Sequence, residues 1–208
     1  MSELKLETNE QIASYGIGRQ MGDHIATQSF EGVELNAVIA GIQQSFAGEE
    51  LSIEAEKIQE AFNVIQERMQ KQAEEAAKEA AKEGTQYLEK NAQREEVIVT
   101  DSGLQYEILT AGEEGGANPT RESTVRTHYH GTFIDGKVFD SSYERGQPAE
   151  FPVGGVIAGW TEALQLMTKG AKWRLTVPYQ LAYGEQGSPG GIPPLATLVF
   201  DVELIDIL

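Results

Sequence analysis

A few residues of this sequence could carry conventional catalysis. His128 and His130 stand two apart and would project from one face of a strand, so they form a conceivable metal pair. No third ligand follows at a suitable spacing, and a solvent-facing pair is the alternative. Asp140 and Glu144 could act as paired acids, or as a buried structural acid and a loop acid. With no cysteine and no Gly-x-Ser-x-Gly motif, the sequence indicates no nucleophile, metal or cofactor.

Aromatic side chains gather in the second half of the chain, where they could form an apolar binding pocket. They are Tyr129, Phe133, Phe139, Phe151, Trp160, Tyr183 and Phe200. Aromatic residues at strand and helix spacing belong more often to a core than to a ligand site. Composition therefore indicates no more than a globular domain with an affinity for something apolar.

The elements that would position these side chains follow from periodicity. Four stretches alternate apolar and polar residues, which is the pattern of half-buried strands. They begin at Leu104, Val125, Trp173 and Leu198. Asp135-Gly136 predicts a hairpin turn, and the spacing from Trp160 to Met167 predicts a short helix that ends by Gly170. A short helix on one face of an antiparallel sheet makes an α+β domain.

The first half of the chain has helical patterns instead. Thr8 and Gln11 form a capping-box signal for a first helix. A second helix carries an apolar stripe over Leu35–Phe46 and ends at Gly48. A third runs from about Ser52 to Asn91, and its second half resembles the Glu-Ala-Ala-Lys sequences that act as semi-rigid spacers.

These helices need a surface on which to bury their apolar stripes. A second copy of the chain would supply one, so we expect a homodimer through the N-terminal helices. The expected domains are a helical dimerisation region over 1–50, a long spacer helix over 51–95 and the sheet domain over 96–208. In the alternative arrangement, the helices dock onto the chain's own sheet.

Charge and composition restrict the partners. The 208 residues carry a formal net charge of -17, which argues against nucleic acid because binding there depends on lysine and arginine. The start, Met1 to Lys5, lacks a basic segment followed by an apolar run. We therefore expect a cytoplasmic protein with no membrane partner.

Three motifs carry a family resemblance. The segments "VRTHYHGTFIDGKVFDSS", "PVGGVIAGWTEALQLMTKGAKWRLTVP" and "LAYGEQGSPGGIPPLATLVFDVEL" together resemble the FKBP-type peptidyl-prolyl cis-trans isomerases over roughly Asp101–Leu208. The helical first half is similar to the dimer-forming arm of bacterial members, including the macrophage infectivity potentiator group. The mass of 22.7 kDa suits their small cytoplasmic relatives. The resemblance implies a curved antiparallel sheet over a short helix, and a rotamase that assists protein folding.

The resemblance also implies a site. Trp160 would form the floor of a proline pocket on the short helix. The walls would be Tyr129, Phe139, Val156, Ile157 and Phe200, with Ile192 also binding substrate. The Ile157 backbone N–H would bind the substrate carbonyl, and Asp140 and the Tyr183 hydroxyl would be polar groups at the rim. The loop from Gly184 to Pro194 would cover the site.

Such a pocket can act without a nucleophile. Rotation about an X–Pro amide meets a barrier of roughly 18–20 kcal/mol from resonance. The planar amide is the more polar state, so an apolar pocket favours the twisted transition state over it. The implied partners are unfolded or proline-containing proteins and macrolide inhibitors such as rapamycin. The alternative function is a chaperone or peptide-binding module in which isomerisation is incidental.

Overall fold

The computed structural model describes residues 5–189 and 191–208, and the chain divides into two compact units, residues 1–72 and 73–208. The prediction about the start of the chain depends mostly on residues 1–4, which lie outside the described part. So does residue 190 of the predicted covering loop. Among the described residues, no helix has the length and apolarity needed to cross a bilayer.

The N-terminal unit consists of α1 (Asn9–Gln28), α2 (Leu35–Ala47) and the first part of α3 (Ala55–Asn91). The predicted capping box is present: the Gln11 backbone N–H donates to Thr8 Oγ1 over 3.3 Å, and the Thr8 N–H donates to Gln11 Oε1 over 3.2 Å. Gly48 ends α2 with a φ of 69°, as expected for a left-handed cap. Helix α3 begins at Ala55, slightly later than Ser52, because the Glu54 carbonyl accepts the first helical hydrogen bonds.

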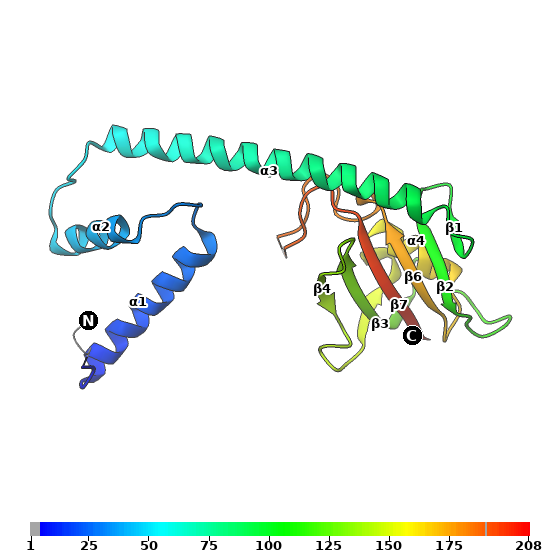
Figure 1. Cartoon of the computed structure of the whole chain (residues 1–208). Helices are drawn as coiled ribbons and strands as arrows, with labels where there is room; N and C mark the ends of the chain where they lie inside the picture. The colour runs from blue at the N-terminus through cyan, green and yellow to red at the C-terminus, as the bar shows by residue number, and fades with distance from the viewer. Residues whose placement is uncertain (1–4, 190) are drawn as a thin grey trace. The chain divides into compact units, whose positions relative to one another are not determined.

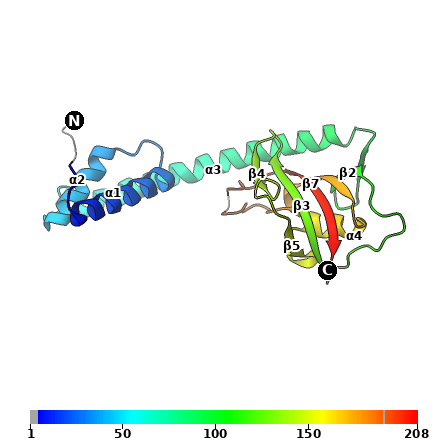
Figure 2. The same cartoon turned by 90° about the horizontal axis from the view of Figure 1, so that it is seen from below.

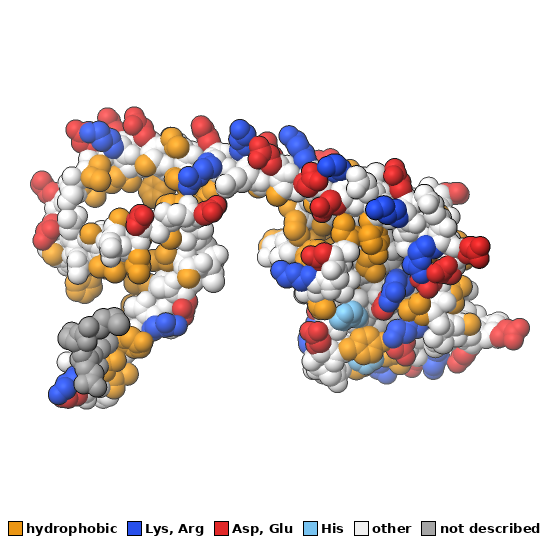
Figure 3. All heavy atoms as spheres, viewed as in Figure 1, with side chains coloured by type: hydrophobic (Ala, Val, Ile, Leu, Met, Phe, Trp, Pro, Cys, Tyr) orange, Lys and Arg blue, Asp and Glu red, His pale blue; other side chains and the backbone are white. Residues whose placement is uncertain are grey.

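The described residues of the N-terminal unit form no buried core in one chain. None of the described side chains between residues 5 and 72 is buried. Its apolar side chains include Phe46, which is 95% exposed, and Leu35, which is 63% exposed. Figure 3 shows apolar side chains gathered on these helices. An isolated unit of this kind leaves its apolar stripes in water, which disfavours folding.

The C-terminal unit is built on a seven-stranded antiparallel sheet (Figure 1). Its strands are β1 (Val97–Val99), β2 (Gln105–Thr110), β3 (Thr124–Phe133), β4 (Val138–Ser141), β5 (Ala149–Pro152), β6 (Lys172–Val177) and β7 (Leu198–Ile207). The order is β1-β2-β6-β7-β3-β4, and β5 also pairs with β3. Because β4 pairs with the second half of β3 and β5 with the first half, the two short strands share one side of it (Figure 2).

Alternation along the strands is largely as predicted. Val125, Leu175 and Val202 are fully buried, each on a strand whose alternate residues are less buried. The predicted hairpin turn joins β3 to β4, where Gly136 has a φ of 87° and the Lys137 N–H donates to Asp135 Oδ1 over 2.9 Å. The α+β class and the antiparallel sheet are confirmed.

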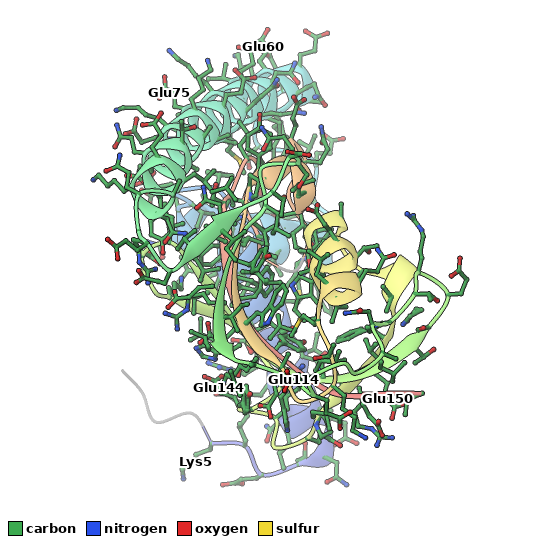
Figure 4. The ribbon with its side chains drawn as sticks, turned by 90° about the vertical axis from the view of Figure 1, so that its right-hand side faces the viewer. Lys5, Glu60, Glu75, Glu114, Glu144 and Glu150 are labelled. Atoms are coloured by element: carbon green, nitrogen blue, oxygen red, sulfur yellow. The ribbon has the colours of Figure 1, made fainter. Side chains whose placement is uncertain are left out.

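A short helix, α4 (Ala158–Leu166), covers one face of the sheet. Trp160, Ala163 and Leu164 are buried there, and Met167 is buried just beyond the helix end. Figure 4 shows side chains filling the space between α4 and the neighbouring strands. This layer is the hydrophobic core, and it sets the position of the residues described below. Two one-turn 3₁₀ helices, η1 (Val153–Gly155) and η2 (Tyr179–Leu181), complete the unit.

The last turns of α3 belong to the C-terminal unit and pack against its sheet, so the alanine-rich helix is not a free spacer along its whole length. Gly84 is buried, and a Cβ there would lie 2.5 Å from Thr197 Oγ1. Asn91 Nδ2 donates to Gln105 Oε1 over 2.9 Å and to Thr176 Oγ1 over 3.3 Å. Small residues permit this close approach, because α3 has little side-chain bulk on that face.

The contact between the end of α3 and the sheet explains why the predicted alternation of buried and exposed residues fails along β2. The sequence places Ile108 on the apolar side of β2 and Gln105 on its polar side. In the structure Ile108 is 47% exposed and Gln105 is 4% exposed. The Gln105 amide donates to the Leu88 carbonyl of α3 over 3.0 Å, so its burial is matched by hydrogen bonding.

Candidate functional site

A cavity of about 310 Å³ opens between the sheet and the start of α4. Its walls come from β3, β4, β5 and β7, from the turn that leads into α4, and from the segment after η2. The lining residues are Tyr129, Phe139, Asp140, Phe151, Gly155, Val156, Ile157, Trp160, Tyr183 and Phe200. The cavity is therefore mainly aromatic and aliphatic, with polar groups from only a few side chains.

Trp160 is the central aromatic side chain of the cavity. It is 4% exposed, and its ring lies edge-on to Tyr129 and Phe200, with centroid distances of 5.3 Å to each. Phe151 stands 5.9 Å away in the same T-shaped geometry. The Trp160 indole nitrogen is buried and has no hydrogen-bond partner among the described residues. Edge-to-face contacts on several sides fix the ring, so it presents a rigid apolar surface.

Phe139 and Phe200 form an adjoining wall, and a glycine behind them makes their position possible. Their ring centroids lie 5.5 Å apart at an interplanar angle of 88°. A Cβ on Gly131 of β3 would stand 2.7 Å from Phe139 Cζ and 3.0 Å from Phe200 Cε1. Any larger residue at this position would displace one or both rings.

The polar edge of the cavity is a cluster of three side chains. The Tyr129 hydroxyl donates to Asp140 Oδ2 over 2.5 Å, and Arg145 Nη2 donates to the Tyr129 oxygen over 2.6 Å. Arg145 Nη1 also donates to Asp140 Oδ1, which closes the cluster. The Arg145 guanidinium carbon lies 5.4 Å from the Tyr129 ring centroid. Neighbouring elements supply the three groups: β3, β4 and the turn after β4.

These contacts set the ionisation of the cluster. Burial acts to raise the pKa of Asp140, but hydrogen bonds from Tyr129 and Arg145 outweigh it, so the pKa lies below its ordinary value. Burial raises the pKa of Tyr129, and the hydrogen bond to the Asp140 carboxylate adds to that rise. Near neutral pH the cluster therefore consists of a carboxylate, a neutral phenol and a guanidinium, and it holds the Tyr129 ring in place.

Tyr183 and Ile157 stand on other sides of the cavity. Tyr183 is 39% exposed, and burial together with the charge of Asp140 raises the pKa of its hydroxyl. Ile157 is the residue before the first turn of α4, and its carbonyl accepts hydrogen bonds from Trp160 and Thr161. Its own amide N–H has no hydrogen-bond partner among the described residues, so it is a donor that a bound carbonyl can use.

The structure brings eight of the nine predicted site residues to this cavity, and Ile192 is the exception. Ile192 is 8% exposed and belongs to the core cluster. The Ser188 N–H donates to its carbonyl over 2.8 Å, which closes the loop as a small hairpin. The structure places the Ile192 side chain in the core rather than in the cavity lining, and its role in substrate binding remains a prediction. The catalytic roles assigned to Asp140, Tyr183 and Ile157 remain predictions.

Sequence reasoning left three residues out of the site. Phe151 and Gly155 line the cavity, and Arg145 completes its polar edge. Phe151 carried a signal, since it was one of the aromatic residues of this region. Arg145 stands five residues after Asp140 across an irregular turn, and no periodic pattern marks such a pair. Its role depends on the turn conformation.

Each of the two histidines of β3 lies within hydrogen-bond distance of a serine hydroxyl. His128 Nδ1 lies 2.9 Å from Ser142 Oγ, and His130 Nδ1 lies 3.0 Å from Ser141 Oγ. Both side chains are half-buried rather than solvent-facing. Within residues 5–189 and 191–208, no group of three or more histidine, aspartate or glutamate side chains is arranged to hold a metal ion.

Comparisons with known proteins agree with this geometry. The sequence profile described as FKBP-type peptidyl-prolyl cis-trans isomerase matches residues 115–205, and that of the domain amino terminal to such isomerases matches residues 10–108. The chain is 47% identical to the FKBP-type 22 kDa peptidyl-prolyl cis-trans isomerase of Escherichia coli K12 over the whole of both chains. It is 38% identical to the outer membrane protein MIP of Legionella longbeachae, over 97% of this chain and 87% of that protein.

Solved structures show the same likeness. The crystal structure of FkpA from Escherichia coli covers 98% of this chain and 98% of its own, with a TM-score of 0.69 at 36% identity. A peptidyl-prolyl cis-trans isomerase from Pseudomonas syringae has a TM-score of 0.58 at 37% identity, over 63% of this chain and 95% of that one. On its fold, its cavity and these similarities, the chain belongs to the FKBP-type peptidyl-prolyl cis-trans isomerase family.

Proposed function

We propose that this isomerase rotates X–Pro bonds in the aromatic cavity without covalent chemistry. The observation that carries the proposal is a cavity of about 310 Å³ walled by aromatic side chains, with its ionised groups confined to one edge. A proline ring fits such apolar walls, and the Ile157 amide offers a donor to the adjacent carbonyl. Holding the carbonyl in place contributes orientation, and the apolar walls favour the less polar twisted amide.

The Asp140 cluster acts in this scheme by positioning. With its pKa below the ordinary value, Asp140 stays ionised near neutral pH and cannot donate a proton to the substrate. Its hydrogen bonds to Tyr129 and Arg145 instead fix the Tyr129 ring against Trp160. The negative charge of Asp140 at the cavity edge is paired with Arg145, so the apolar walls remain the dominant environment for a bound proline.

The test replaces the central ring and compares it with a tryptophan outside the cavity. Trp160→Ala removes the cavity floor, whereas Trp173→Ala removes a buried ring that stacks on Tyr106 at 4.3 Å and does not line the cavity. Each change should destabilise the fold by about 3–5 kcal/mol. At a temperature where both variants remain folded, we expect only Trp160→Ala to lower kcat/KM on a short X–Pro peptide, by about tenfold or more, which corresponds to 1.4 kcal/mol.

Equal losses in the two variants would refute the assignment of the cavity. Circular dichroism of each variant in the assay buffer establishes that it is folded. Rapamycin adds a second reading, because we propose that macrolides of this kind occupy the same cavity and compete with the peptide. A peptide rate that rapamycin leaves unchanged would contradict that part of the proposal.

We further propose that the protein is a homodimer through its N-terminal helices. The support is the apolar surface of that unit, where Phe46 is 95% exposed and Ile39 is 43% exposed. A Cβ at Gly18 or Gly22 of α1 would meet nothing within 4 Å in one chain, which leaves room for a closely packed partner helix. An unpartnered surface of this extent favours a second copy of the chain.

Sedimentation equilibrium tests the dimer. We expect the full chain to sediment as a dimer and Phe46→Glu to shift it toward the monomer, because a buried charge at the interface is costly. Gln93→Glu adds the same charge at an exposed position outside the helical unit and should leave the dimer intact. A Phe46→Glu protein that remains dimeric would contradict this interface.

The second candidate function is chaperone-like capture of unfolded chains, favoured by the apolar cavity that each chain of the proposed dimer would present. Two cavities on one dimer would raise the effective concentration for a single unfolded substrate. The Trp160→Ala dimer separates this function from isomerisation. Suppression of aggregation by that variant would establish capture as independent, and its loss together with peptide activity would favour isomerisation alone.

A cytoplasmic location stays a prediction, which cell fractionation against marker enzymes would test.

A further inference from the structure

A second groove adjoins the substrate cavity. It encloses about 510 Å³ along the exposed side of α4, where Gln165 and Leu166 contribute to it, and Arg121 and Gly154 contribute from outside the helix. Val156 lines both this groove and the cavity. The two spaces are therefore neighbours across one side chain. A peptide held by its proline in the cavity extends beyond it, since each residue adds about 3.3–3.6 Å of chain.

Arg121 is the cationic residue that lines this groove, and a backbone hydrogen bond fixes the position of its main chain. The Gly154 N–H donates to the Arg121 carbonyl over 2.9 Å. A Cβ on Gly154 would stand 3.1 Å from Arg121 Cγ, so the arginine stem packs directly against the glycine. Arg121 forms no ion pair with any described residue. Its guanidinium is thus available to a ligand.

The groove also contains a carboxylate, Glu162, which forms no ion pair with Arg121. Glu162 Oε2 accepts a hydrogen bond from Ser102 Oγ over 2.6 Å, which directs it to the loop before β2. The protein as a whole carries a formal net charge of -17, so its general field disfavours acidic peptides. A preference for an acidic substrate residue would therefore need a local cation, and Arg121 is placed to provide it.

We propose that the substrate chain on one side of the proline passes over Val156 into this groove, and that Arg121 there selects an acidic side chain. The inference rests on the proposed isomerisation in the cavity and names a specificity residue for it. An exposed arginine and a carboxylate attract modestly, so the preference of glutamate over glutamine should be about two- to fivefold in kcat/KM at low salt. Higher salt should reduce it.

The experiment uses the full chain and pairs of capped X–Pro peptides. The two peptides of a pair are identical except at one position, where one has glutamate and the other has glutamine. Different pairs place this variable residue at successive positions before and after the proline. The measured quantity is the ratio of kcat/KM for the glutamate and glutamine peptides. Wild type should give a ratio of about two to five at one or more positions. Arg121→Gln should return this ratio to one or below, and Arg121→Lys should retain most of it because the charge is kept.

Lys137→Gln is the matched control. Lys137→Gln also removes one positive charge, but from the exposed turn between β3 and β4, which lines neither the cavity nor the groove. The ratio of kcat/KM for the glutamate and glutamine peptides should therefore stay at its wild-type value. The inference is overturned if no position gives a wild-type preference, or if the preference survives Arg121→Gln. It is also overturned if Arg121→Gln slows both peptides of a pair equally, which is the result of a merely structural role. Isomerisation at the spontaneous rate with every peptide would instead refute the proposed function.

Discussion

Gly131→Ala tests the cavity without altering any residue that lines it. Gly131 lies on β3 behind Phe139 and Phe200, and a Cβ there would stand 2.7 Å from Phe139 Cζ. Ordinary contacts of a Cβ begin at 3.4 Å, so the ring must retreat by 3.4 − 2.7 = 0.7 Å. Phe133 stands 5.1 Å from Phe139 between ring centroids, which restricts movement on that side. We therefore expect the displaced ring to move toward the cavity.

Two effects follow from this displacement. Overpacking of the wall should lower the free energy of unfolding by about 1–3 kcal/mol. Because a misplacement of about 1 Å can cost a hundredfold in rate, a shift of 0.7 Å should lower kcat/KM for a short X–Pro peptide by about tenfold. Urea denaturation measures the first effect, and a peptide isomerisation assay on the folded variant measures the second.

Gly112→Ala separates the two effects. A Cβ at Gly112 would stand 2.7 Å from the Thr168 carbonyl oxygen and 2.8 Å from that of Lys169, so this variant is also overpacked. Neither contact belongs to the cavity. Gly112→Ala should lose stability and keep its kcat/KM while folded. The reasoning is refuted if folded Gly131→Ala keeps kcat/KM within about twofold of wild type, or if Gly112→Ala loses as much activity.

Two further changes test other parts of the unit. Asn91→Ala leaves Gln105 and Thr176 without their α3 partner, so the free energy of unfolding should fall by about 1–3 kcal/mol in urea denaturation; an unchanged value would mean that the end of α3 is not docked. Arg145→Gln should raise the pKa of Asp140, which carboxyl NMR can follow, because the guanidinium helps hold that pKa below its ordinary value. A carboxyl group whose pKa is lowered by folding stabilises the protein at pH values above its unfolded pKa, and this stabilisation is lost as the pH falls through the pKa of the folded state. The variant should therefore lose less stability than wild type on acidification. An identical Asp140 titration curve in the two proteins would show that the ion pair has no effect.

Much of the fold could be predicted from local pattern. The capping box at Thr8, the cap at Gly48 and the turn at Asp135-Gly136 all depend on residues close together in sequence. The same is true of the alternation along β3 and β7, where each strand has one face toward the core. Burial on one side leaves a period-two signal whatever the other strands do.

The failures of prediction have a common origin. Gln105 is buried and Ile108 exposed because the end of α3 covers part of the second face of the sheet. Periodicity along β2 carries no information about a helix that arrives from another part of the chain. The placement of Ile192 in the core cluster could not be read from local pattern for a similar reason, since it depends on a hairpin within an irregular loop.

By itself the sequence determined the elements, the class of fold and, through its motifs, the family and most of the cavity lining. Only the tertiary structure decided which side chains meet: Arg145 with Asp140, the end of α3 with the sheet, and the groove of Arg121 with the cavity across Val156. The physical reason is that helix and strand patterns follow from the burial of one face of a local element. Contacts between elements depend on strand register and turn conformation, which residues distant along the chain fix together.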